Sequence, residues 1–171
     1  MLRYLKAVRL AKERKLRVHF DWYGDKKHNP KYFSEIEKEY LLLDIADYMT
    51  LHESRTDIEK VYRDSDIFCL PSLFEGYPNV VAEAMASGLP VVCSNRYENP
   101  YIVEDGVNGF LFDPENVQDI VYAIQRLSSL SADERRQMGL RNRQLCLERN
   151  TEEAFLKAYV ELIERSLYYQ A

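Results

Sequence analysis

Residues 67–93 read IFCLPSLFEGYPNVVAEAMASGLPVVC, and this stretch decides the fold. It opens with residues 67–70, a continuous apolar run typical of a strand that is buried on both faces of a parallel sheet. A loop follows, and then a helix that we expect Asn79 to cap and Gly88 to end. The run at residues 90–93 predicts the next strand. A strand, a helix and a second strand in this order indicate parallel strands joined by a right-handed crossover.

The same alternation continues on both sides of this stretch. Helices are expected where apolar residues recur every three or four positions, and strands where they alternate or form short runs. The expected elements before it are a helix over residues 2–10, a strand over 16–23, a helix from Pro30, a strand over 48–51 and a helix with a capping box of Thr56 and Glu59. Those after it are a strand at 110–112, a helix from Val117, a helix from Ser131 and a last helix that holds Phe155 and Tyr159. We therefore predict an α/β fold, a single Rossmann-like domain over residues 1–171 with a parallel sheet and helices on both faces.

The composition is that of an ordinary globular protein. Hydrophobic residues make up 46% of the 171 residues and charged residues 30%, which argues against a disordered chain. No apolar run approaches the length needed to span a bilayer, and the first residues have no apolar signal core. The three cysteines lack the paired spacing of zinc or redox motifs, and we interpret Cys69 and Cys93 as structural residues. We expect a cytoplasmic protein in a reducing compartment.

The distribution of charge excludes one class of partner. A formal net charge of −5 argues against broad nucleic-acid binding, which depends on clustered positive charge. One stretch is locally basic, because residues 3–17 hold seven basic residues and the single acid Glu13. This pattern is typical of the solvated face of a helix, and the alternative is a patch that binds anionic lipid or a phosphorylated ligand. His19, His28 and His52 have no acidic partner that the sequence places beside them, and we do not expect them to be catalytic.

The loop at residues 71–79 is the richest candidate site. It joins a strand to the start of a helix, where unpaired N–H groups, from about Asn79 onward, favour a phosphate. Gly76 would let a ligand approach the backbone closely. Taken by itself, the segment is more typical of a plain capped turn.

Glu83 favours the binding interpretation. It is the only ionisable residue in the helix segment 80–88. A carboxylate one turn inside a helix either interacts favourably with the helix dipole or accepts hydrogen bonds from the hydroxyls of a ribose. Glu75, on the loop, would face the same cleft and hold hydroxyls of a sugar. We interpret the two carboxylates as parts of one nucleotide-sugar site.

Residues 74–92, FEGYPNVVAEAMASGLPVV, resemble the donor motif of the family 4 retaining glycosyltransferases, which have the GT-B fold of two Rossmann domains. Two glutamates separated by seven residues are the hallmark of this motif, and Glu75 and Glu83 have this spacing. The resemblance extends to residues 62–72 and 102–112. It implies that the chain corresponds to the C-terminal, donor-binding half of such an enzyme.

The resemblance also implies roles for individual positions. Glu83 matches the glutamate that binds the nucleotide ribose, and Glu75 matches the one that contacts the donor sugar, which makes it the catalytic candidate. Leu51 and Arg55 lie where the family builds its base pocket. The family needs no metal ion or other cofactor, which agrees with the lack of a metal-ligand cluster in the sequence. The expected donor-binding residues are Glu75, Gly76, Tyr77, Pro78, Asn79, Val80 and Glu83.

Several parts of the family's enzymes have no counterpart in the sequence. The first strand of the domain, the Arg and Lys that stabilise the leaving diphosphate, and the acceptor-binding N-terminal domain are expected to be absent from this chain. We therefore expect the chain to bind a donor but to be inactive alone, with its cleft and the apolar face of its last helix exposed and able to self-associate. Residues 96–103 stand where many relatives have a glycine pair, and residues 51–53 where a glycine is usual, so donor contacts there would differ.

The leading interpretation is the donor-binding part of a retaining glycosyltransferase that uses a UDP-sugar to extend a polysaccharide or a glycolipid. Its expected partners are the nucleotide sugar and a glycan or lipid-linked acceptor, and its expected location is the cytoplasm, at the inner face of the membrane in the whole enzyme. A non-catalytic nucleotide-sugar-binding or regulatory module is the alternative from another class. A nucleotide-sugar epimerase of the same architecture is a third interpretation, which the pairing of Glu75 with Glu83 makes weaker.

Overall fold

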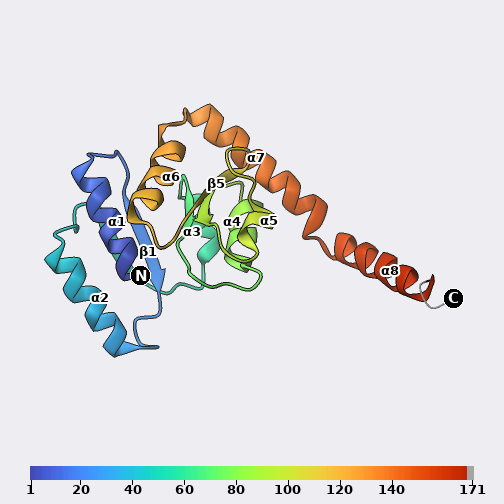
Figure 1. The fold of residues 1–171 in the computed structure, drawn as a ribbon, viewed down its shortest axis with the longest axis horizontal. Helices are drawn as coiled ribbons and strands as arrows, with labels where there is room; N and C mark the ends of the chain where they lie inside the picture. Colours follow the sequence, from blue (N-terminus) through green and yellow to red (C-terminus); the bar gives the residue numbers. More distant parts are fainter. Residues whose placement is uncertain (169–171) are drawn as a thin grey trace.

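The structure, a computed structural model, describes residues 1–168, in which helices alternate with parallel strands (Figure 1). The helices are α1 (Leu2–Glu13), α2 (Pro30–Leu42), α3 (Ile58–Arg63), α4 (Asn79–Ala86), α5 (Asn99–Ile102), α6 (Val117–Ser129), α7 (Ala132–Arg149) and α8 (Glu152–Tyr168). The strands are β1 (Phe20–Gly24), β2 (Met49–Glu53), β3 (Phe68–Leu70), β4 (Val91–Ser94) and β5 (Gly109–Phe112). The predicted α/β fold is confirmed, although β1 begins only at Phe20.

The strands form two parallel sheets, whereas the sequence predicted one. β1 pairs with β2, and β4 lies between β3 and β5. The division falls between β1 and β3. In the doubly wound strand order 3-2-1-4-5-6 the first strand lies between the second and the fourth. Within residues 1–168 no strand occupies this position, and the sheet is divided there.

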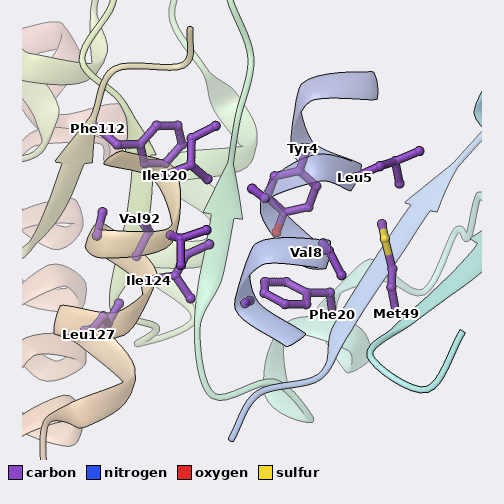
Figure 2. Packing of buried hydrophobic residues seen from close by; sticks show 14 of the residues in the cluster. Tyr4, Leu5, Val8, Phe20, Met49, Val92, Phe112, Ile120, Ile124 and Leu127 are labelled. Carbon is purple, nitrogen blue, oxygen red and sulfur yellow. The ribbon is translucent and has the colours of Figure 1, made fainter. Parts of the chain in front are cut away.

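The larger hydrophobic core joins the two sheets (Figure 2). It contains Phe20 of β1 and Met49 of β2 together with Val92 of β4, and α1 and α6 cover it. The Tyr4 ring of α1 meets the Phe20 ring edge-on at a centroid distance of 5.8 Å. Burial, together with the adjacent Cys69 of β3, raises the pKa of the Tyr4 hydroxyl. Because Tyr4 contacts both β1 and β3, side-chain packing connects the sheets where backbone pairing does not.

β4 is the most buried strand, and its four residues are all buried. Its side chains alternate between the two cores, with Val92 in the larger one and Val91 and Cys93 in the smaller one, which also contains Val81 and Met85 of α4. β3 is only half-buried. The strand predicted at residues 67–70 is present and packs against a core on each face, but it is only partly buried, because β3 lies at the edge of its sheet and β4 takes the central position.

The contact between α4 and α7 is very close. Gly139 of α7 packs directly against the carbonyl group of Gly88, which follows α4 and has a left-handed φ of 82°. Three residues along α7, the buried Asn142 donates hydrogen bonds of 2.8 Å to the carbonyl oxygens of Leu89 and Asn108. One helix thus fixes the backbone after α4 and the turn before β5.

The starts of several helices test the predicted caps. Asn29 and Asn116 cap α2 and α6, and Ser131 forms a capping box with Glu134 in α7. The predicted capping box of Thr56 and Glu59 is wrong, because the N-cap of α3 is Asp57. Asn79 does not cap α4 either, because the helix begins at Asn79 and Pro78 is its N-cap. Proline at the N-cap has no side-chain acceptor to offer the first amides.

α8 points away from the rest of the molecule (Figure 1). Its large apolar side chains are mostly exposed, as the sequence predicted: Phe155 63%, Leu156 53%, Tyr159 55%, Val160 52%, Leu162 63% and Ile163 46%. Whether this face drives self-association stays a prediction. None of the helices in residues 1–168 is both long and apolar enough to cross a membrane.

Three of the seven basic residues at the start of the chain have acidic partners. Arg9 pairs with Glu13, Lys12 with Asp44 and Asp47, and Arg3 lies 3.5 Å from a carboxylate oxygen of Glu115. The Lys12 pairing lowers the pKa of Asp47 and raises that of Lys12. These pairs support a solvated helix face over a patch for anionic ligands.

We predict that Gly139→Ala lowers the free energy of unfolding by about 1 to 3 kcal/mol, as overpacking usually does. A Cβ at this position would overlap the Gly88 carbonyl oxygen, and this effect opposes the helix propensity of alanine, which favours the variant by roughly 1 kcal/mol. Urea denaturation followed by circular dichroism measures the change. The matched control is Gly76→Ala, whose Cβ would meet nothing within 4 Å. Equal stability of both variants would contradict the close α4–α7 packing.

Candidate functional site

The candidate site lies at the carboxyl ends of β3 and β4. In open parallel sheets this edge is where ligands bind, because the loops that leave it surround a crevice. The loop after β3 covers residues 71–78 and leads directly into α4, and the loop after β4 covers residues 95–98. The two strands are adjacent, so both loops leave the same edge.

Three contacts anchor the 71–78 loop. The Phe74 ring meets the Tyr97 ring edge-on, with centroids 4.6 Å apart. The Tyr77 hydroxyl accepts a hydrogen bond from the side-chain amide of Asn150, at the end of α7. Pro78 is buried. Between these anchors Glu75 is half-buried and Gly76 is exposed with open space beside its Cα.

The backbone at the start of α4 offers fewer free donors than the sequence predicted. The Asn79 N–H donates to the Tyr77 carbonyl oxygen at 3.0 Å, and the N–H groups of Val81 and Ala82 donate to Pro78. Within residues 1–168 the N–H groups of Gly76 and Val80 have no acceptor. The N–H group of Tyr77 has no acceptor among these residues either. These amides, together with the positive end of the α4 dipole, are what the backbone next to the helix can offer an anion.

Glu83 projects from α4 into solvent with one oxygen already held. The Tyr62 hydroxyl of α3 donates to Oε2 of Glu83 at 3.1 Å. Burial, and then this hydrogen bond, raise the pKa of Tyr62, so the phenol stays protonated at neutral pH and remains a donor. The bond fixes the orientation of the carboxylate and leaves Oε1 available to accept a ligand hydroxyl. Tyr62 is not among the predicted site residues, although a buried tyrosine generally needs a partner for its hydroxyl.

A pocket of about 400 Å³ lies between α4 and α7 and includes Glu83. Its floor is apolar, with small side chains from α4, and its rim carries a guanidinium, an amide and a hydroxyl. The lining residues are Ala82, Glu83, Ala86, Arg143, Cys146, Leu147, Asn150 and Thr151. Asn150 therefore contributes both to this pocket and to the anchor of Tyr77.

A second pocket, of about 310 Å³, lies between the 71–78 loop and the start of α1. Pro71 and Leu73 form its wall on the loop side, and Arg3 is its basic residue. Glu75 lines neither pocket. The structure thus places the loop directly before the helix that carries Glu83, and Glu83 alone of the two glutamates lines one of these two pockets.

The predicted base-pocket residues lie apart from this cluster. Leu51 of β2 packs against the larger core, and Arg55 makes an ion pair with Asp57 that raises the pKa of Arg55. Among residues 1–168 no hydrogen bond or ion pair links either residue to Glu83 or to the 71–78 loop. Their role in base binding stays a prediction.

Other candidate chemistries find little support. His52 does have an acidic partner, contrary to expectation, because its Nε2 lies 2.6 Å from Asp21 and its ring stacks on Tyr23. This pair forms only when β1 and β2 align, which the sequence could not show. Burial raises the pKa of the thiols of Cys69 and Cys93 to about 12, so neither is a ready nucleophile. The described residues contain no group of three or more potential metal ligands.

Comparison with known proteins identifies the family. The profile of the family described as "Glycosyl transferases group 1" matches residues 1–129. An uncharacterised glycosyltransferase of Haemophilus influenzae is 41% identical over 86 residues, which are 50% of this chain and 24% of that protein. The UDP-Gal:alpha-D-GlcNAc-diphosphoundecaprenol alpha-1,3-galactosyltransferase of Escherichia coli is 36% identical over 74 residues, 43% of this chain and 19% of that protein.

Solved structures agree with the fold. A glycosyltransferase from Rickettsia africae superposes with a TM-score of 0.83 at 18% identity, over 96% of this chain and 44% of that one. HepE of Anabaena, crystallised with UDP-glucose, has a TM-score of 0.81 at 21% identity, over 94% of this chain and 44% of that one. The chain therefore spans less than half the length of these proteins, and its fold is that of the GT-B glycosyltransferases. Together with the match over residues 1–129, this shows that the chain belongs to the group 1 glycosyltransferases.

Proposed function

We propose that this chain is the donor-binding part of a retaining glycosyltransferase, which transfers a sugar from a UDP-sugar to a polysaccharide or glycolipid acceptor. The observation that carries the proposal is the position of Glu83. Its carboxylate is oriented by Tyr62 on an exposed helix face, close behind a loop with free backbone amides. A fixed, solvent-facing acceptor beside an anion-binding helix start suits a ribose that carries a diphosphate.

Each part of the site has a distinct role in this proposal. Glu83 accepts hydrogen bonds from the ribose hydroxyls through its free oxygen. The amides of Gly76 and Val80 bind the diphosphate, which the α4 dipole also stabilises. Glu75 holds hydroxyls of the donor sugar next to the reacting carbon. Leu51 and Arg55 would contact the base.

The names of two similar proteins support a uridine donor. The Escherichia coli relative is named for the transfer of galactose from UDP-Gal, and the HepE structure contains UDP-glucose. We infer the same class of donor here.

The reaction requires groups beyond those of this chain. As the bond between the sugar and the diphosphate breaks, negative charge develops on the diphosphate, and preorganised donors must stabilise it. Two amides and a helix dipole supply part of this stabilisation, and we infer that cationic side chains and the acceptor site belong to the rest of a longer enzyme. We also infer that no metal ion takes part.

We predict that Glu83→Ala weakens nucleotide binding by about tenfold to a hundredfold, because a hydrogen bond to a charged group is lost. Isothermal titration calorimetry with UDP, GDP and ADP measures this effect and also identifies the preferred base. Glu37→Ala, at an exposed position of α2, is the matched control. Unchanged affinity in the folded Glu83→Ala variant would refute the ribose assignment.

The Glu75→Gln variant tests whether Glu75 contacts the sugar of the donor and not its nucleotide. We expect it to weaken the binding of UDP-sugar by about tenfold, through loss of a charged acceptor, and to leave the affinity for UDP unchanged. Titration of the same variant with both ligands gives the comparison. Equal losses for the two ligands would mean that Glu75 does not contact the sugar.

The 171-residue chain by itself should bind donor and transfer no sugar. Radiolabelled UDP-sugars incubated with the purified chain and with lipid-linked or glycan acceptors test this expectation. Labelled product above the level of the Glu83→Ala variant would overturn the view that the catalytic machinery is incomplete here.

A further inference from the structure

Three residues other than glycine have a left-handed backbone among those the structure describes. They are Lys15 with φ 56°, Asp44 with φ 49° and Tyr97 with φ 51°. Lys15 and Asp44 directly follow the C-caps of α1 and α2, where a left-handed residue commonly ends a helix. Tyr97 follows no helix, so its conformation needs another explanation.

The conformation of Tyr97 is costly for its residue type. A bulky side chain with positive φ crowds its Cβ against the backbone, whereas glycine adopts this conformation freely. The structure thus combines, at one position, a backbone conformation suited to glycine with an aromatic side chain.

The ring of Tyr97 has one aromatic partner, and that partner belongs to the candidate donor site. Its centroid lies 4.6 Å from that of Phe74, at an interplanar angle of 71°. Both rings are mostly exposed, Tyr97 at 55% and Phe74 at 70%, so neither is needed to fill a core. Phe74 directly precedes Glu75 and Gly76, and the ring contact therefore acts on the part of the loop that would face the sugar.

The backbone that carries Tyr97 is itself firmly held. The neighbouring Arg96 lies 3.0 Å from Asp113 and 3.3 Å from Glu115, both just after β5. The Asn95 N–H donates to the Phe112 carbonyl oxygen at 2.8 Å. The loop after β4 is thus fixed to the end of β5, and strained conformations persist where the surroundings hold them in this way.

We propose that Tyr97 is a positioning residue of the donor site, which holds Phe74, and through it Glu75 and Gly76, in the geometry that binds the donor sugar. This inference rests on the proposed function of the 71–78 loop. The strained backbone of Tyr97 is retained because glycine would relieve the strain but would lose the ring. At this position glycine would therefore favour stability, whereas tyrosine favours donor binding.

Tyr97→Gly and Tyr97→Phe test these two effects. Glycine relieves the strain and removes the ring, so we expect a melting temperature that is unchanged or higher, and binding of UDP-sugar that is weaker by about threefold to tenfold. Phenylalanine keeps the ring and should match the wild type in both measurements. Tyr101→Ala, at an 80% exposed position of α5, is the control for loss of an exposed tyrosine.

Hydrogen exchange at millisecond times, read by mass spectrometry, adds a readout without ligand. Amides of the 71–78 loop should exchange faster in Tyr97→Gly than in the wild type, Tyr97→Phe and Tyr101→Ala. A lower melting temperature together with weaker binding would indicate a merely structural residue and would overturn the proposal. Unchanged loop exchange in Tyr97→Gly would overturn it as well.

The outcomes separate this inference from the proposed function. If Glu83→Ala abolishes binding and Tyr97→Gly binds UDP-sugar as the wild type does, the donor site stands and the role of Tyr97 is refuted. If the wild type binds no nucleotide, the proposed function fails and the inference about Tyr97 fails with it. Weaker sugar-nucleotide binding in Tyr97→Gly, with stability retained and the loop loosened, supports both.

Discussion

The pairing of β4 with β3 on one side and β5 on the other is the interaction on which the rest of the structure depends. The four residues of β4 are all buried, and they separate two cores, because Val92 faces the larger core and Val91 and Cys93 face the smaller one. Parallel pairing also aligns the carboxyl ends of neighbouring strands. The loops after β3 and β4 therefore leave the sheet side by side, and the contact between Phe74 and Tyr97 follows from that alignment.

Around this frame the candidate site is assembled from separate parts of the chain. Tyr62 of α3 orients Glu83, and Asn150 at the end of α7 holds Tyr77. The close contact of Gly139 with Gly88 brings α7 alongside α4, which lets the end of α7 reach the loop. These supports fix the segment on either side of Glu75 and Gly76 while both residues remain accessible. Such preorganisation lowers the entropic cost of binding a ligand.

Two features of the fold affect the surroundings of the candidate site. They are the division of the sheet between β1 and β3 and the exposed helix α8. The chain spans less than half the length of the solved glycosyltransferases that share its fold. Its larger core still joins both sheets through α1, so the candidate site rests on a packed scaffold although the sheet is divided. The exposed apolar residues of α8 lie directly after Asn150 and Thr151, which line the pocket that contains Glu83. A partner segment bound to α8 would thus lie close to this pocket.

The amino-acid sequence alone was enough to predict the family, the spacing of Glu75 and Glu83, and the order of helices and strands except for the short helix α5. These features depend on signals that act over a few residues, such as Pro30 at a helix start, Gly88 after a helix end and the motif at residues 74–92. Only the tertiary structure decided that β4 and not β3 is the central buried strand, that Asp57 replaces the expected cap at Thr56, that His52 meets Asp21, and that Tyr62, Tyr97 and Asn150 support the site. Each of the partners that support the site lies more than twenty positions along the chain from the residue it contacts. Whether such residues meet depends on how the whole chain packs, and no local pattern encodes that packing.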